Sequence, residues 1–351
     1  MAEQPQTNVT AYTSPEVKID VMSRKYLWFA ISGLLLIPGI IAIIICSSRF
    51  HAPVKLGIDF TGGSLLQVRF EQQVSIEQFR HALGTVRIAG EHLNGEIQSE
   101  IETAQRTATG STLATAGNGS TLILRTKALA REHVAELQQA LANPDLKLGN
   151  FITERSETVG PKIGSELLRN ALIALATGIL AILGYIAFRY QFDFAVCAIA
   201  AMVHDVLIMV GAFALMSLTL GAEADGLLVT ALLTVMGFSV HDTIVIFDRF
   251  RENLLYAKKG DAFADIANRS VNQTFVRSIN TSLTVVLTLL PLVLFGGSSI
   301  FFFALSMLIG VVSGTYSSIF NAAPLLVIWR DGWQKKNPPA VAVTATPSSA
   351  T

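Results

Sequence analysis

The sequence predicts an α-helical membrane protein with six membrane-spanning helices and one small α+β domain outside the bilayer. The 351-residue chain is 51% hydrophobic and only 15% charged, with a mean hydropathy of +0.50, which is too apolar for an ordinary soluble domain. Six apolar runs each reach the roughly 20 residues that cross the hydrocarbon layer. One long polar stretch follows the first run and is the candidate extramembrane domain.

The first apolar run, Tyr26 to Cys46, lies within a helix predicted for residues 25–48, behind a polar tail of residues 1–24. It is longer than the about 7–15 residues of a secretory signal core, so we expect it to be retained. A bundle over residues 167–330 holds the other runs, and residues 331–351 form a tail predicted to be disordered. These five runs lie near 168–188, 192–218, 227–247, 276–296 and 301–328, the last two separated by the turn residues Gly296, Gly297, Ser298 and Ser299.

Lysine and arginine gather in alternate loops, which predicts the orientation. The positive set is Lys18, Arg24, Lys25, Arg189, Arg249, Arg251, Lys258, Lys259, Arg269, Arg330, Lys335 and Lys336. The loop near Glu223 and Asp225 contains no basic residue. We therefore expect a multi-pass membrane protein with both termini cytoplasmic and residues 49–166 on the outer side of the membrane.

The polar stretch at 49–166 is predicted to form a βαββαβ unit, the order of a ferredoxin-like fold. Period-two alternation marks the first strand, and serine capping with helical spacing marks the first helix. The predicted elements are strands at 64–70, 95–102, 120–126 and 150–158 and helices at 75–87 and 129–142. A Thr, Ala, Gly and Ser-rich insertion around 104–119 is expected to form a loose hairpin.

Asp242 and Arg277 are the first candidate site, on consecutive antiparallel helices near the ends that the loop charges place in the cytoplasm. An ionisable group at bilayer depth costs about 2.5–3.5 kcal/mol on insertion scales, so it is seldom kept without a use. One interpretation is a static ion pair that fixes helix packing. The other is a proton site, because burial favours the neutral acid and a nearby guanidinium favours the carboxylate.

His204 and Asp205 lie inside the third apolar run, and His241 precedes Asp242. Histidine titrates near neutrality and can relay protons. A cluster of polar side chains that only joins helices explains the same residues equally well. Both interpretations stay open.

Asp248, Arg249 and Arg251 follow the fourth run and are expected to anchor the cytoplasmic interface. Two segments connect the extramembrane domain to the membrane helices, and both are expected to act as flexible joints. Their joint residues are Gly57, Gly62 and Gly63 before the first strand and Gly160 and Pro161 after the last strand. A strand rather than a helix follows the first glycine-bearing segment, which excludes a phosphate-binding loop there.

The sequence predicts neither an enzyme nor a cofactor. It contains no Gly-x-Ser-x-Gly elbow, His-Glu-x-x-His helix or Walker sequence. Both cysteines, Cys46 and Cys197, fall in apolar runs, which predicts no disulfide framework or metal cluster. Zero net charge argues against a nucleic-acid surface. Because no nucleotide-binding motif is present, the energy for any transport would have to come from an ion gradient or from a partner protein.

The chain resembles the SecF family, the smaller membrane subunits of bacterial SecD–SecF protein-export complexes. The resemblance rests on GIDFTGGSLLQVRF, ETVGPKIGSELLRNAL, GFSVHDTIVIFDRFREN and NQTFVRSINTSLT, which occur in family order over roughly residues 20–330. The tails and the 104–119 insertion lie outside the family pattern. The resemblance implies half of an RND-type (resistance-nodulation-division) bundle that uses the proton-motive force to assist export. It also implies that Asp242 and Arg277 are linked to proton movement.

The implied partners are a SecD-like subunit, the SecYEG channel, translocating preproteins and membrane lipid. Two alternatives to this function are an RND-like proton-coupled efflux transporter and a non-transporting assembly scaffold. Efflux pumps of that type usually carry two six-helix halves, whereas this chain has one. Loss of proton-dependent export on replacing Asp242, in an intact complex, would exclude the scaffold.

Overall fold

The computed structural model describes residues 19–88, 91–92, 96–99, 120–129, 131–146, 148–258 and 261–336. The chain divides into two compact units. The helix unit comprises Met1–Ala42, Gly178–Phe213 and Ala231–Thr351, and the domain unit comprises Ile43–Thr177 and Ala214–Thr230. The predicted 104–119 insertion and both tails beyond residues 19 and 336 lie outside the described residues.

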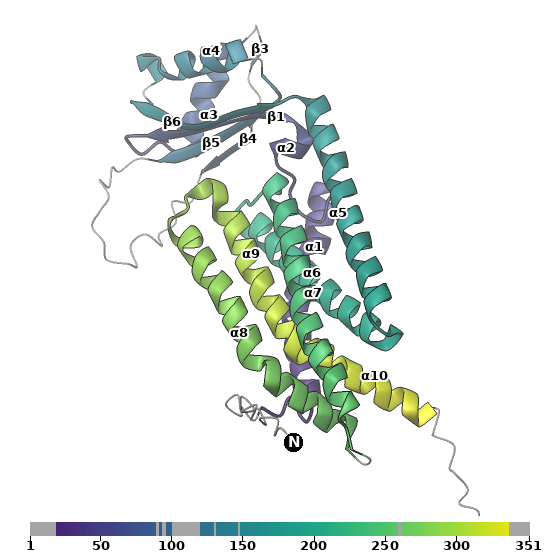
Figure 1. Cartoon of the computed structure of the whole chain (residues 1–351). Helices are drawn as coiled ribbons and strands as arrows, with labels where there is room; N and C mark the ends of the chain where they lie inside the picture. Colours follow the sequence, from purple (N-terminus) through teal and green to yellow (C-terminus); the bar gives the residue numbers. More distant parts are fainter. Residues whose placement is uncertain are drawn as a thin grey trace, which may run out of the picture. The chain divides into compact units, whose positions relative to one another are not determined.

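Six helices of the described chain are long and apolar enough to cross a membrane, which confirms the predicted number (Figure 1). They are α1 (Lys25–Phe50), α5 (Pro161–Arg189), α6 (Phe192–Thr219), α7 (Gly226–Leu255), α8 (Phe263–Phe295) and a sixth path. The sixth path runs through α9 (Ser298–Ser317), the π-helical turn η3 (Ser318–Ala322) and α10 (Ala323–Lys336).

Two helices extend well past their apolar runs, and this corrects two expectations. α7 continues to Leu255, so Asp248, Arg249 and Arg251 lie within the helix and not after it. α8 begins at Phe263, so Arg277 lies inside the helix and not at its start. In both extensions buried residues recur at helical spacing between exposed polar ones. Ile266, Ser270 and Thr274 are the buried residues of this kind at the start of α8. A search for uninterrupted apolar runs therefore finds only part of each helix.

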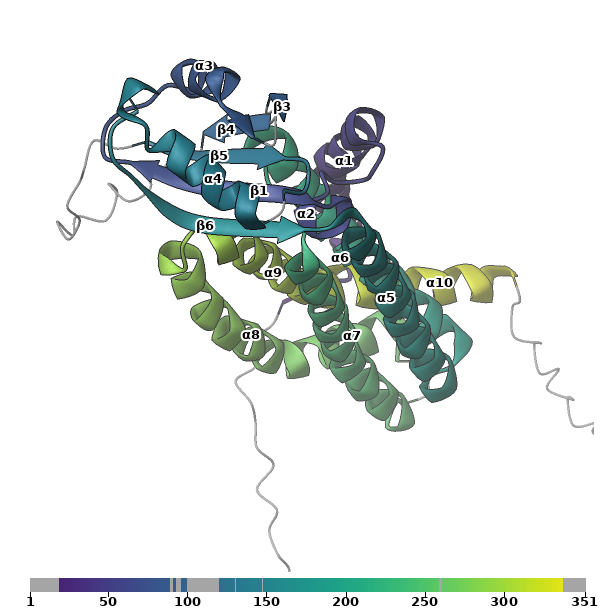
Figure 2. The same cartoon turned by 90° about the horizontal axis from the view of Figure 1, so that it is seen from above.

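The α+β domain has the predicted ferredoxin-like topology. Its sheet order is β4-β5-β1-β6, antiparallel throughout. The strands are β1 (Gly63–Phe70), β4 (Glu96–Ser99), β5 (Thr121–Thr126) and β6 (Phe151–Val159), with helices α3 (Ile76–Thr85) and α4 (Arg131–Leu141). Smaller elements are α2 (Ile58–Thr61), the short strands β2 (Arg87–Ile88) and β3 (Glu91–His92), and η2 (Pro144–Leu146). Both domain helices contribute buried side chains to the core of the sheet, and α4 is seen over the strands in Figure 2.

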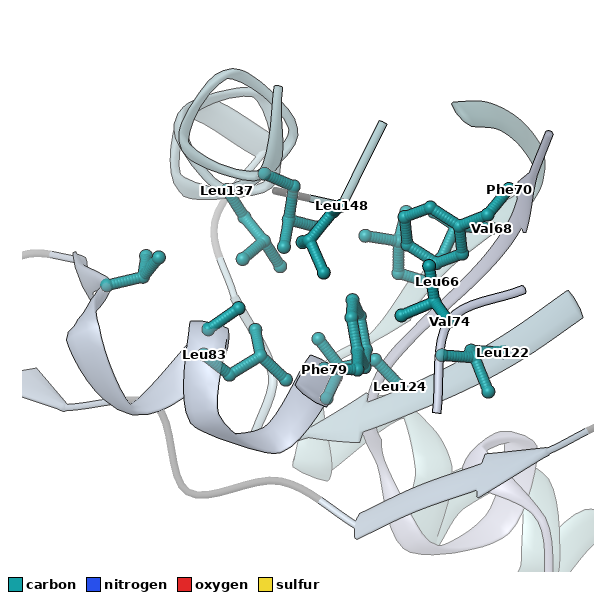
Figure 3. Close-up of a cluster of buried hydrophobic side chains, with 13 residues drawn as sticks. Leu66, Val68, Phe70, Val74, Phe79, Leu83, Leu122, Leu124, Leu137 and Leu148 are labelled. Atoms are coloured by element: carbon teal, nitrogen blue, oxygen red, sulfur yellow. The ribbon is translucent and has the colours of Figure 1, made fainter. Parts of the chain in front are cut away.

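Alternating residues of β1 and β5 form the domain core (Figure 3). Leu66, Val68 and Phe70 share one face of β1, and Leu122 and Leu124 share the matching face of β5. Phe79 and Leu83 of α3 and Leu137 of α4 pack against these residues. A capping box starts α3: the Gln78 amide donates to Ser75 Oγ at 3.1 Å, and the Ser75 amide donates to Gln78 Oε1 at 3.0 Å.

Candidate functional site

Two glycines let α9 pack closely on α7 inside the helix unit. A Cβ added at Gly310 would lie 2.6 Å from a methyl group of Val235, and one added at Gly314 would lie 3.2 Å from Ser239 Cβ. Gly310 and Gly314 form a Gly-xxx-Gly pair, the spacing that lets membrane helices approach closely. This contact places the hydroxyl groups of α9 beside the aspartate-bearing part of α7.

Asp205 of α6 is held by hydroxyls from two other helices. Its Oδ2 accepts hydrogen bonds from Ser239 Oγ of α7 and Ser317 Oγ of α9, each at 2.6 Å. Its Oδ1 accepts one from Ser313 Oγ of α9 at 2.8 Å and lies 3.0 Å from His204 Nδ1. The residue is only 1% exposed. The two oxygens of this side chain thus have four polar partners, about as many as a carboxyl group has acceptor sites.

Asp242 of α7 is equally buried, at 2% exposed, but has far fewer partners. Within the described residues its carboxyl group accepts one hydrogen bond, at Oδ2 from Thr315 Oγ1 at 3.4 Å, which is long for a hydroxyl donor. The same hydroxyl has another acceptor in the Val311 carbonyl, at 3.0 Å, and also contacts Ser282 Oγ. A hydroxyl has one proton to donate. The Asp242 carboxyl group therefore lies in the helix interior with one weak, shared hydrogen bond.

Arg277 lies within electrostatic range of Asp242 without forming a direct hydrogen bond or ion pair with it among the described residues. The Arg277 and His241 side chains are exposed on the isolated chain. The two predicted proton-site residues thus interact electrostatically without a direct contact. Exposed ionisable groups on membrane-spanning helices are costly against lipid.

The remaining predicted polar residues of α7 form surface contacts in the helix unit. Asp248 accepts hydrogen bonds from Arg189 and from Tyr190 Oη, at 3.1 Å and 3.0 Å. Burial and the Asp248 hydrogen bond together raise the pKa of Tyr190. Arg249 pairs with Glu252 at 2.6 Å and Arg251 with Asp248 at 3.9 Å. These exposed pairs suit an interface role, which stays a prediction.

The predicted joints of the domain unit are sites of close packing. A Cβ at Gly62 would lie 2.8 Å from Pro161 Cα, and one at Gly63 would lie 2.8 Å from the Thr126 carbonyl oxygen. Both glycines have positive φ, 72° and 134°, a region that disfavours side chains. A Cβ at Gly57 would approach the Ala224 carbonyl oxygen at 3.0 Å, whereas Gly160 has space around it. A role as joints stays a prediction.

Sequence reasoning did not identify any of the serine and threonine hydroxyls that donate hydrogen bonds to the two aspartates. Ser239 lies three residues before Asp242, and Ser313, Thr315 and Ser317 alternate along α9. The missed signals were this Ser-x-Thr-x-Ser pattern and the Gly310/Gly314 pair in an otherwise apolar run. Within the described residues, no group of three or more metal-ligating side chains lies close enough to bind a metal ion.

The chain matches two families of protein-export membrane proteins. The family "Protein export membrane protein SecD/SecF, C-terminal" matches residues 141–332, and the "SecD/SecF GG Motif" matches residues 50–74, which include Gly62 and Gly63. A protein translocase subunit SecF of Thermobaculum terrenum is 44% identical over 318 residues, covering 89% of this chain and 94% of that protein. The Synechocystis protein of the same name is 38% identical, covering 92% and 98%.

Two solved structures match almost the whole chain. A crystal structure of SecDF from Thermus thermophilus, a translocon-associated membrane protein, is 32% identical with a TM-score of 0.71 and covers 90% of this chain. SecDF in a super-membrane-facing form is 33% identical with a TM-score of 0.59 and covers 91%. The chain spans only 39% and 40% of those two SecDF chains.

Proposed function

The chain belongs to the SecF family of protein-translocase membrane subunits, and we propose that it uses the proton-motive force to assist protein export. It is a multi-pass transport protein and not an enzyme. A SecD-like subunit is its partner, as the longer SecDF chains imply. The matched family is one of export subunits, which disfavours the efflux alternative.

The observation that carries the proposal is the environment of Asp242. A buried carboxylate with one weak hydrogen bond is costly, so this arrangement favours the neutral acid. A rearrangement that brings the Arg277 guanidinium into contact would favour the carboxylate and release the proton. Alternation between these arrangements, each open to a different side of the membrane, moves one proton per cycle through Asp242.

The energy available is sufficient for mechanical work. One charge carried across the full potential yields about 2.3 kcal/mol per 100 mV. We propose that the α+β domain and the SecD-like subunit convert this energy into pulling on preproteins that leave the SecYEG channel. In this proposal membrane lipid surrounds the helix bundle. The His204–Asp205 pair holds α6 against α7 and α9 beside the proton site.

The proposed orientation places both termini in the cytoplasm and the α+β domain in the periplasm of a bacterial inner membrane. Its support is the alternation of lysine and arginine between loops. A cysteine placed at Leu220 is expected to react with an impermeant thiol reagent added outside intact spheroplasts, and one placed at Lys258 is not. The reverse labelling pattern would contradict this topology.

Replacing Asp242 tests the proton site. Asp242→Asn keeps the shape of the side chain and removes its exchangeable proton, so gradient-stimulated export in proteoliposomes should fall to the level seen without a gradient. Asp248→Asn is the matched control on the same helix, since Asp248 lies at the exposed Arg189 contact. It should keep most of the stimulation. Copurification of each variant with the SecD-like subunit checks assembly.

A scaffold without transport is the second candidate function. The hydroxyl contacts of Asp205 favour it, since they join α6, α7 and α9 and would stabilise packing without any proton movement. Undiminished gradient stimulation by Asp242→Asn in an assembled complex would reject the proton site at Asp242 and favour the scaffold.

A further inference from the structure

The loop between α6 and α7 is hydrogen-bonded to the start of the α+β domain inside the domain unit. The Ala224 amide donates to the Lys55 carbonyl oxygen, and the Gly57 amide donates to the Ala224 carbonyl oxygen, each at 2.7 Å. Leu56 and Ala224 thereby form a parallel β-bridge. Gly57 is needed here because a Cβ would lie 3.0 Å from the Ala224 oxygen.

Glu223 adds an ionic contact on each side of this bridge. Its Oε1 lies 3.0 Å from Lys55 Nζ, and its Oε2 pairs with Arg125 of β5. The three side chains are 9% to 15% exposed, so water screens them little. Removing one partner of a buried ionic group leaves the remaining charges uncompensated, which is strongly unfavourable. Glu223 thus joins the loop both to the chain that enters the domain and to its central sheet.

We propose that Glu223 is a positioning residue for export: it fastens the α6–α7 loop to the α+β domain so that movements of α6 and α7 are transmitted to that domain. α6 carries Asp205 and α7 carries Asp242. The contact set formed by Lys55, Leu56, Gly57, Arg125, Glu223 and Ala224 is named the loop clasp. The proposal deepens the proposed function and rests on it for its export readout.

The neighbouring connections support a stiff attachment rather than a free hinge. A Cβ added at Gly164 of α5 would lie 2.7 Å from the Gly62 amide nitrogen, so the start of α5 packs on the turn before β1. Asp59 of that turn accepts a hydrogen bond from the Gly226 amide at the start of α7 at 3.3 Å. Within its described residues the domain is therefore attached to helix ends at α1, at α5 and at the α6–α7 loop, and the loop clasp forms the last of these attachments.

Glu223→Gln tests the clasp directly. The variant removes the charge and keeps the size, so hydrogen exchange at the Ala224 and Gly57 amides in the assembled complex should speed up at least tenfold. Gradient-stimulated export should fall at least threefold, with export in the absence of a gradient unchanged. Glu154→Gln on β6, which breaks the pair with Arg69 of β1 in the same domain, is the control and should change neither the exchange of these amides nor export.

A disulfide across the bridge separates positioning from folding. Leu56→Cys with Ala224→Cys places two thiols on paired residues of a β-bridge. Oxidation should leave export normal in the parent chain and restore gradient-stimulated export to Glu223→Gln, and reductant should remove that rescue. Ala224→Cys alone is the matched control. Both native cysteines are buried, so they can remain.

Three outcomes would overturn the proposal. One is unchanged amide exchange in Glu223→Gln, and the second is normal gradient-stimulated export despite rapid exchange. The third is an oxidised bridge that blocks export in the parent chain, because the clasp would then have to open in each cycle. Failure of the proposed function looks different: the parent chain itself would show no gradient-stimulated export, while the exchange result would still report on the clasp.

Discussion

Asp205 and Asp242 are two buried aspartates of one helix unit with opposite surroundings. Asp205 receives three serine hydroxyls and faces a histidine nitrogen, whereas Asp242 shares one threonine hydroxyl with other acceptors. Their exposed fractions, 1% and 2%, are nearly the same. Burial alone therefore does not distinguish the two carboxyl groups; the number of hydrogen-bond donors that contact each of them does.

α9 supplies hydroxyls to both aspartates from different faces. Ser313 and Ser317 are four residues apart and lie on one face, where both contact Asp205. Thr315, between them in sequence, points to Asp242 and Ser282. A shift of α9 would change the partners of both carboxylates together. The π-helical turn at Ser318–Ala322 directly follows this segment, and such turns are frequent at functional sites.

The largest expected effect on stability separates the two aspartates. Asp205→Ala should lower the free energy of unfolding by about 2 kcal/mol, because three interhelical hydrogen bonds at about 0.6 kcal/mol each are lost. Asp242→Ala should change it by less than about 0.5 kcal/mol or stabilise the protein, because a poorly paired buried carboxyl group is removed. Reversible unfolding in mixed micelles measures both.

Equal losses for the two variants would break the comparison, since they would mean that Asp242 has partners as firm as those of Asp205. Asp205→Asn is the useful intermediate. Serine hydroxyls can turn and accept from an amide, so its loss should be smaller than that of Asp205→Ala. Export by Asp205→Asn should keep its dependence on the gradient, in contrast to Asp242→Asn.

Most of the fold follows from local sequence patterns. The apolar runs predict the six helices, and the alternation in SLLQVRF and STLILRT predicts the central strands around Val68 and Leu124. These signals need no knowledge of tertiary contacts. The predicted end of α7 near Phe247 and the predicted start of α8 near Val276 were wrong. Both helices continue through amphipathic turns, whose charged residues interrupt an apolar run.

The candidate site is less predictable because it depends on which helices are neighbours. The charges at Asp205 and Asp242 stand out in apolar runs, but a serine in a membrane helix is ordinary. Only the packing of α9 on α7, set by Gly310 and Gly314, shows that Ser313 and Ser317 serve one aspartate and Thr315 the other. Likewise, Glu223 in a short loop reveals its two cationic partners only when the domain has folded.

A third carboxyl group, Asp225, extends the comparison to a site outside the spanning helices and should show the smallest effect. Burial raises its pKa, and neighbouring Asp59 adds to the rise, while the Leu228 amide hydrogen bond at 3.1 Å opposes it. A raised pKa means that the folded state binds more protons than the unfolded state above about pH 4. Stability should therefore decline as the pH rises through that window.

Asp225→Asn keeps a capping oxygen for α7 and cannot ionise, so its stability should lack this decline. Unfolding midpoints of the parent chain and of Asp225→Asn, measured from pH 4 to pH 8, test the sign. A parent chain that instead gains stability relative to Asp225→Asn as the pH rises would contradict the prediction, because it would show that the fold favours the ionised form of Asp225.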